Sequence, residues 1–247
     1  MAYTIDKIIK NKQGFEITIA NQTYLVDSSL YPIFLPYIHK EIEIDDFKII
    51  QIFSDTFFVL KPLYSLMNQH KLSVQDIKSY LLKKEIEPDT IEIILHFLLK
   101  ETFLDDKLFV NNYFQIYQKD KGIVAFKNFL NQHGISSSLK EEFLKRYQEN
   151  ENYIQNYIQR QVNQNHHSLQ ILKYKIKQNL LQKGFSQSII EKYLQNLEID
   201  ETPQLLKDYQ KIQKNEKNPY KIISKLVHKG YNVDDIKKIM KDGEDYE

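Results

Sequence analysis

The sequence contains no cysteine among its 247 residues. This absence excludes disulfide bonds, thiolate zinc sites, iron–sulfur clusters and cysteine nucleophiles. Long apolar stretches are also missing: no run approaches the roughly 20 residues of a membrane-spanning helix, and the N-terminal segment lacks the apolar centre of a signal peptide. We therefore expect a cytoplasmic protein that does not enter membranes.

An excess of charge of one sign is absent as well, because 34 basic and 33 acidic residues give a net charge of +1. Proteins that bind nucleic acid through phosphate neutralisation alone usually carry a strongly basic balance. Any contact with nucleic acid must therefore come from local clusters of lysine. The hydrophobic share of 42% is that of an ordinary globular protein, and the length allows one large domain or two smaller ones.

Glycine is scarce, with six residues. The sequence accordingly has no glycine-rich phosphate loop and no Gly-x-Ser-x-Gly elbow, and it has no His-Glu-x-x-His pair. Adjacent His166 and His167 would diverge by about 100° on a helix and have no matching ligand nearby, which argues against a metal site. Asp105 and Asp106 are better explained as helix caps than as a catalytic or magnesium-binding pair. We expect no catalytic residues, no metal and no cofactor.

The first 60 residues favour a small β-rich module. β-branched and aromatic residues partly alternate in three segments: Tyr3–Ile9, Phe15–Ile19 and Thr23–Val26. This pattern predicts a small antiparallel sheet. The segment Leu30–Tyr37 is apolar but interrupted by two prolines, which predicts a short helix or turn, and the module is expected to end near Pro62.

The remainder of the chain contains a repeat of 46 to 50 residues. A leucine column consists of Leu81, Leu130, Leu180 and Leu226. Four residues later, a glycine column consists of Glu85, Gly134, Gly184 and Gly230. In each unit the pattern predicts an amphipathic helix that ends before this column. A tight connection and a second amphipathic helix follow. Glycine is the preferred residue just past a helix C-terminus, where the backbone turns left-handed.

A further helix precedes each of these pairs, so that the repeat consists of three helices. The four preceding helices are predicted at Leu63–His70, Asp106–Lys119, Tyr153–Gln164 and Gln204–Lys214. A capping-box pattern at Ser73–Asp76 and the carboxylates of Asp105 and Asp106 indicate helix starts. Prolines lie at predicted junctions and not within apolar helical stripes: Pro88, Pro203 and Pro219.

These patterns predict a mainly α fold in which tandem three-helix repeats form a curved elongated array behind the small β-rich N-terminal module. The predicted domains are the module at 1–60 and the repeats at 61–105, 106–151, 152–200 and 201–247. Stacked repeats place equivalent positions on one continuous face, which can serve as a binding surface.

Several short motifs resemble those of the RecX family of recombination regulators in their order and spacing. Phe103–Phe109 matches the family's Leu-Asp-Asp-x-x-Phe stretch, Lys121-Gly122 its Lys-Gly pair and Leu130–Ile135 its Leu-x-x-Lys-Gly-Ile signature. The first unit and the later ones are similar at Leu72–Ile77, Lys183–Ser186 and Lys229–Tyr231, and Met1–Ser54 could match the β-rich extension of long family members. The sequence departs from the family pattern at Glu85, Thr102 and Val110.

The resemblance implies a modulator, and specifically an inhibitor, of the RecA recombinase. Such a protein binds the RecA filament on single-stranded DNA in its groove and regulates recombination, DNA repair and the SOS response. We expect a monomer that contacts the filament and also single-stranded or double-stranded DNA. Two alternatives stay open: a stand-alone DNA-binding helical-repeat protein, and a helical-repeat scaffold for another protein partner.

The candidate binding residues are basic and lie in or near the second helix of each repeat. A cation stands directly before the glycine column in every unit, where it stabilises the helix C-terminus by about 0.3–1 kcal/mol or, alternatively, belongs to a basic strip along the array. The candidates for contact with the filament or DNA are Lys83, Lys84, Lys119, Lys121, Lys127, His133, Lys173, Lys175, Lys177, Lys183, Lys221, Lys225 and Lys229.

Overall fold

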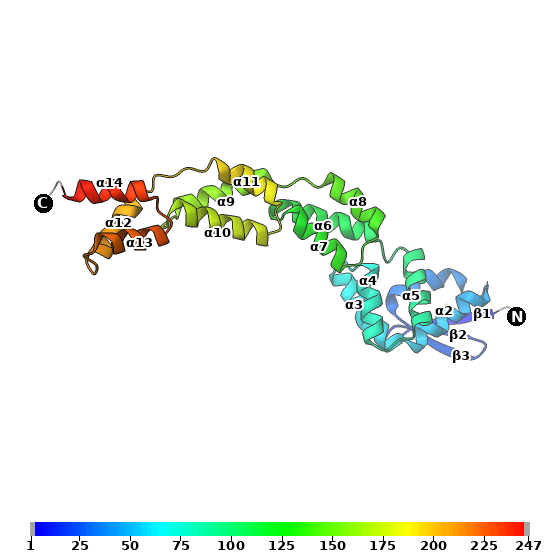
Figure 1. Ribbon diagram of the computed structural model, residues 1–247. Coiled ribbons are helices and arrows are strands. Elements are labelled where there is room, and N and C mark those ends of the chain that lie inside the picture. The colour runs from blue at the N-terminus through cyan, green and yellow to red at the C-terminus, as the bar shows by residue number, and fades with distance from the viewer. Residues whose placement is uncertain (1–2, 245–247) are drawn as a thin grey trace. The chain divides into compact units, whose positions relative to one another are not determined.

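The structure is a computed structural model that describes residues 3–244, and it is mainly helical with one small sheet (Figure 1). The sheet is antiparallel with strand order β3-β2-β1-β4. Its strands are β1 (Tyr3–Lys10), β2 (Phe15–Ile19), β3 (Gln22–Val26) and β4 (Glu41–Ile42). Phe15, Ile17 and Ile19 are buried because alternate residues of a strand point to the same face. The predicted mainly α fold with a β-rich N-terminal module is confirmed.

Short helical turns follow the first three strands, as expected for Leu30–Tyr37: η1 (Ser28–Leu30), α1 (Tyr31–Phe34) and η2 (Leu35–Tyr37). Two longer helices come next, α2 (Ile44–Asp55) and α3 (Phe57–Gln69). The helix predicted from Leu63 therefore begins earlier, at Phe57, and Pro62 lies inside it. This proline is exposed on the helix surface.

Eleven further helices occupy the described part of the chain after α3. They are α4 (Val74–Lys83), α5 (Pro88–Lys100), α6 (Asp106–Asp120), α7 (Ile123–Gln132), α8 (Ser137–Arg146), α9 (Glu151–Asn163), α10 (Leu169–Gln182), α11 (Gln187–Gln195), α12 (Thr202–Gln213), α13 (Pro219–His228) and α14 (Val233–Glu244). We group them, with α3, into four consecutive sets of three and refer to these sets as repeats 1 to 4.

The helix boundaries follow the local signals of the sequence. Ser73 forms a complete capping box with Asp76, since each side chain accepts a hydrogen bond from the backbone N–H of the other residue. Pro88, Pro203 and Pro219 lie at the first or second position of their helices, where proline costs no intrahelical hydrogen bond. These predicted junctions are confirmed.

The chain divides into two compact units, which we describe separately. Unit 1 contains Met1–Tyr113 and Leu130–Glu141, and unit 2 contains Phe114–Phe129 and Glu142–Glu247. The division passes through α6, α7 and α8 of repeat 2.

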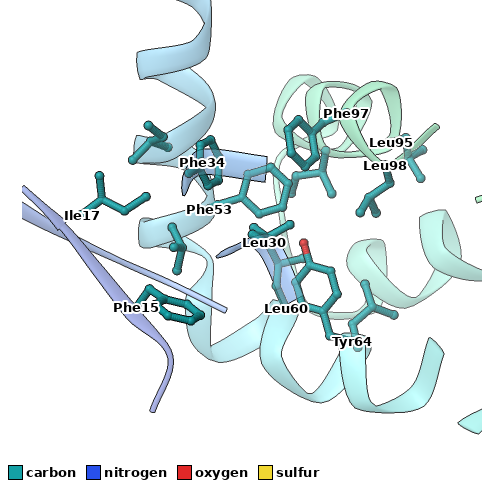
Figure 2. Packing of buried hydrophobic residues seen from close by; sticks show 14 of the residues in the cluster. Phe15, Ile17, Leu30, Phe34, Phe53, Leu60, Tyr64, Leu95, Phe97 and Leu98 are labelled. Carbon is teal, nitrogen blue, oxygen red and sulfur yellow. The ribbon is translucent and has the colours of Figure 1, made fainter. Parts of the chain in front are cut away.

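One hydrophobic core joins the sheet of unit 1 to the helices of repeat 1. Phe15 and Ile17 of the sheet, Phe53 of α2 and Phe97 of α5 belong to the same buried cluster (Figure 2). The rings of Phe53 and Phe97 have their centroids 4.8 Å apart. The β-rich module therefore folds onto repeat 1 and shares its core.

Unit 2 contains separate buried clusters for repeats 3 and 4. In repeat 3 the cluster includes Ile176 and Leu180 of α10 together with Ile190 of α11. In repeat 4 it includes Leu226 of α13 and Ile236 of α14. The leucine column thus supplies a fully buried residue to the second helix of each repeat, with 0% of the side chain exposed at all four positions.

The glycine column is left-handed at every position. The φ angles are +60° at Glu85, +63° at Gly134, +79° at Gly184 and +85° at Gly230. The predicted left-handed ends of the second helices are confirmed, and Glu85 adopts the same conformation even though it carries a side chain.

Candidate functional site

Successive repeats are joined by hydrogen bonds to the backbone carbonyl groups of the residues directly before the glycine column. The carbonyl oxygens of His133, Lys183 and Lys229 accept hydrogen bonds from the N-terminus of the second helix in the preceding repeat. The donors are the Ser73 hydroxyl at 2.9 Å, the Gly122 N–H at 3.0 Å and the Ser168 hydroxyl at 2.6 Å, in the same order. The basic residues before the glycine column are therefore part of the contact between repeats.

The glycines permit the close approach that these junctions require. A Cβ atom on Gly134 would lie 2.6 Å from Cγ of Gln75, and one on Gly230 would lie 2.6 Å from the hydroxyl of Ser168. A Cβ atom on Gly184 would overlap Ala125. The glycine column consequently serves repeat stacking as well as helix termination.

Three carboxylates add a second contact at the same junctions. Of these, only Asp106 was recognised as a capping residue from the sequence; Glu149 and Glu201 were not. The N–H of the first residue of the second helix donates to a carboxylate at or just before the following repeat. The pairs are Val74 to Asp106 at 2.9 Å, Ile123 to Glu149 at 3.1 Å and Leu169 to Glu201 at 2.6 Å. A helix N-terminus attracts anions through its free N–H groups and its dipole.

The acidic pair at the start of α6 is confirmed as a capping pair. The Asp105 carboxylate accepts a hydrogen bond of 3.0 Å from the N–H of Leu108 in its own helix. Asp106 instead caps α4. Burial raises the pKa of Asp106 above its usual value, and the hydrogen bond from the N–H of Val74 opposes this shift.

The side chains before the glycine column are mostly engaged inside the protein. Nδ1 of His133 lies 2.9 Å from the carboxylate of Asp76. Nζ of Lys183 is 3.4 Å from the carboxylate of Asp120, and Nζ of Lys229 is 2.7 Å from that of Asp208. The fourth residue directly before the glycine column is Lys84, whose Nζ lies 5.9 Å from the ring centroid of Tyr80.

Two of these pairs favour the charged forms of Lys183 and Asp208. The pKa of Lys183 is raised, chiefly by its hydrogen bond with Tyr153. Burial would raise the pKa of Asp208, but hydrogen bonds from Lys229 and Tyr231 outweigh burial and lower it. Because Lys183 and Lys229 each face a carboxylate, two of the three lysines in the column carry little uncompensated charge toward solvent.

Other candidate lysines also have partners within the protein. Lys177 pairs with Glu191 at 3.0 Å and Lys225 with Glu216 at 3.5 Å, while Nζ of Lys175 is 2.7 Å from Nε2 of His167. The pair formed by Lys177 has an equivalent in repeat 1, where Lys78 contacts Glu92 at 2.6 Å. Both lysines stand three residues before the leucine column and both glutamates eleven residues after it.

Within residues 3–241, eight candidates form no ion pair with a carboxylate, and six of these also lack a contact such as that of Lys84 with the Tyr80 ring or of Lys175 with His167. These six are Lys83 in unit 1 and, in unit 2, Lys119, Lys121, Lys127, Lys173 and Lys221. Lys121 and Lys173 are half-buried and the others are exposed. These side chains are the ones available to bind an anionic partner.

Two exposed tyrosines accompany the lysines on the second helices of repeats 3 and 4. Tyr174 of α10 is 64% exposed and Tyr220 of α13 is 84% exposed. Each stands six residues before the leucine column, and each is followed by a lysine, Lys175 or Lys221. Their shared register is the signal in the sequence that could have singled out this pair.

Metal-binding and membrane-spanning features are not found in the described residues. No group of three or more His, Asp or Glu side chains could hold a metal ion there, and His166 and His167 are exposed. No helix within residues 3–244 has the length and apolar character needed to cross a membrane.

Known proteins resemble this chain over most of its length, although no protein-family model matches it. The regulatory protein RecX of Streptococcus agalactiae serotype V is 31% identical over 196 residues, which cover 73% of this chain and 75% of the relative. This chain belongs to the RecX family. The regulatory protein RecX of Streptococcus mutans serotype c is 27% identical over 96% of this chain and 98% of its own.

A solved structure supports the same fold. A crystal structure of regulatory protein RecX matches 80% of this chain and 100% of its own chain with a TM-score of 0.53 at 19% identity. The relatives are regulatory proteins, and this member of the RecX family is likewise a regulatory protein and not an enzyme.

Proposed function

We propose that this protein binds the RecA recombinase filament on single-stranded DNA, in the groove of the filament, and inhibits the recombinase. Membership of the RecX family supports a regulatory role. The observation that carries the proposal further is the junction that recurs between successive repeats: each time, the carbonyl group directly before the glycine column accepts a hydrogen bond from the residue just before the second helix of the preceding repeat. Repeats joined in the same way can engage neighbouring protomers of a filament, so that individually modest contacts add up.

The lysines without carboxylate partners are the residues we assign to this contact. Lys127, Lys173 and Lys221 lie on the second helices α7, α10 and α13 of unit 2. The paired residues Lys177, Lys183 and Lys229 have a structural role and contribute less. Complementary charge raises the rate of encounter and selects the register of binding.

The test is recombinase ATP hydrolysis on single-stranded DNA, titrated with the wild type and with a Lys127→Glu/Lys173→Glu/Lys221→Glu variant. The wild type should suppress hydrolysis, and the variant should need at least about tenfold more protein for the same effect. The matched control is Lys10→Glu/Lys40→Glu/Lys207→Glu, which changes the charge equally at exposed positions outside the candidate set. Equal potency of both variants would remove these lysines from the contact, and a wild type without effect would refute the proposal.

Tyr174 and Tyr220 favour a second candidate function, direct binding of single-stranded DNA without recombinase. Exposed aromatic rings beside cations are the usual platform for unpaired bases, and each stacked base contributes about 1–3 kcal/mol. A Tyr174→Ala/Tyr220→Ala variant should lose affinity for a labelled oligonucleotide, whereas Tyr174→Phe/Tyr220→Phe should retain it because the ring remains. Binding that is equal in all three proteins would exclude stacking on these residues.

A further inference from the structure

A groove runs between α2 and α5 in unit 1. It has a volume of about 600 Å³ and is lined by Glu43, by the first half of α2 and by residues 92–100 of α5. A smaller cavity of about 40 Å³ adjoins it and shares Asp46, Ile49, Phe97 and Lys100 with it. Both spaces lie between the N-terminal module and α5 of repeat 1.

The floor of this groove is apolar. Among its lining residues, Ile49 is half-buried, Phe97 is buried and Ile93 is 40% exposed. Apolar side chains that line an open groove on a folded surface are characteristic of a site for another polypeptide.

The rim of the groove is acidic. The lining carries four carboxylates, Glu43, Asp45, Asp46 and Glu92, against two lysines, Lys48 and Lys100. Asp45 is paired with Lys48 at 3.7 Å and Glu92 with Lys78 at 2.6 Å. Among the charged lining residues, Glu43, Asp46 and Lys100 form no ion pair within residues 3–241, which leaves two unpaired carboxylates against one unpaired lysine.

Charge and shape together select one kind of occupant. Carboxylates on the rim repel the phosphates of a nucleic acid, whereas lysine or arginine side chains can lay their aliphatic stems on the apolar floor and place their charges at the rim. A groove between two helices accepts the apolar face of a third helix. We propose that the groove between α2 and α5 binds a basic amphipathic helix of a partner protein.

The test uses the full chain and a fluorescent peptide of about 15 residues in which leucine and lysine follow the helical period. A scrambled peptide of the same composition is the control for non-specific attraction. The wild type should bind the patterned peptide at least about tenfold more tightly than the scrambled one. The affinity should fall as salt rises because the rim contacts are exposed.

Two variants locate the site. Glu43→Lys/Asp46→Lys should weaken binding of the patterned peptide at least about tenfold, and Ile93→Gln should weaken it by removing apolar floor. The matched control Asp55→Lys reverses an exposed charge on the same helix outside the groove and should change affinity less than about twofold. Glu43→Gln/Asp46→Asn replaces the first variant if its melting curve differs from that of the wild type.

Three outcomes would overturn the proposal. The first is equal binding of both peptides, and the second is unchanged binding in the groove variants. The third is self-association of the wild type in sedimentation experiments that the groove variants abolish, since this result would assign the groove to a second copy of the chain. Loss of recombinase inhibition without loss of peptide binding, or the reverse, separates this proposal from the proposed function.

Discussion

At the scale of single residues, two constraints act on the position that ends the second helix of each repeat. The backbone is left-handed there, which costs a residue with a Cβ atom about 1–2 kcal/mol. The preceding repeat also lies in contact with the same position in repeats 2, 3 and 4. Glu85 ends the second helix of repeat 1, which has no preceding repeat. The left-handed backbone therefore constrains this position, but its side chain is exposed.

Substitutions at Gly184 and at Glu85 should therefore change the free energy of unfolding in opposite directions. Gly184→Val should lower the free energy of unfolding by at least about 2 kcal/mol, because a β-branched side chain adds overlap with Ala125 to the backbone strain. Glu85→Gly should raise it by up to about 1 kcal/mol, because strain is relieved at an exposed position. Denaturant titrations of both variants provide the measurement. A Gly184→Val protein as stable as the wild type would contradict the stacking role of this glycine.

Asp208 should make the stability of unit 2 depend on pH in the acidic range. Its pKa is lowered in the folded protein by the hydrogen bonds from Lys229 and Tyr231, against the effect of burial. A lowered pKa means that the stabilisation is complete above the unfolded value of about 3.9 and is lost as the pH falls through the folded value. Asp208→Asn should lower the melting temperature at pH 7 by about 2–4 °C. The difference from the wild type should shrink below about pH 4; a constant difference across this range would show that the carboxylate charge is not involved.

At the scale of helices, one carboxylate holds two helix N-termini in unit 2. Glu149 accepts hydrogen bonds from the N–H of Ile123 at the start of α7 and from the N–H and hydroxyl of Ser186 just before α11. These bonds measure 3.1, 2.8 and 2.6 Å. A charged acceptor binds such donors more strongly than a neutral one.

Glu149→Gln should consequently destabilise both helix starts at once. The neutral amide keeps one acceptor but loses the charge, and we expect a loss of about 1–2 kcal/mol. Hydrogen exchange of backbone amides should increase in the first turns of α7 and α11 together. The control is Glu151→Gln, an exposed substitution two residues away, for which α7 should remain protected. Faster exchange at only one of the two helices would contradict the shared cap.

At the scale of the whole molecule, the β-rich module and repeat 1 form one cooperative core. Phe53 is 2% exposed and packs against Phe97, which joins α2 to α5 (Figure 2). The module therefore depends on repeat 1 for its stability, and repeat 1 depends on the module. The proposed groove for a basic helix lies over this same pair of helices.

Phe53→Ala should destabilise the module and repeat 1 by the same amount, about 3–5 kcal/mol. Hydrogen exchange should rise in the sheet and in α5 together, because both lose contacts with one ring. The matched variant is Phe185→Ala, which removes a buried ring from the core of repeat 3 in unit 2. Its exchange should rise in α9–α11. Rapid exchange of the sheet with full protection of α5 in Phe53→Ala would separate the module from repeat 1.

Local patterns were sufficient to predict much of the fold. The period of the apolar residues indicated the helices of the repeats, the capping box indicated the start of α4, and the glycine column indicated the left-handed helix ends. These features depend on neighbouring residues in the chain, so their physical causes are visible in a single sequence. The start of α3 was misplaced because Pro62 is a strong local signal, whereas its exposed position in a helix depends on packing elsewhere.

The roles of charged side chains were decided by tertiary structure. Lys183 and Asp120 are 63 residues apart in the chain, and Ser73 and His133 are 60 apart, yet each pair meets at a junction between repeats. No local pattern reveals such partners, because a lysine in a last helical turn has the same neighbours in the sequence whether it faces solvent or a carboxylate. The sequence therefore predicted where the basic residues lie along the helices, and only packing between repeats determined which of them keep a free charge.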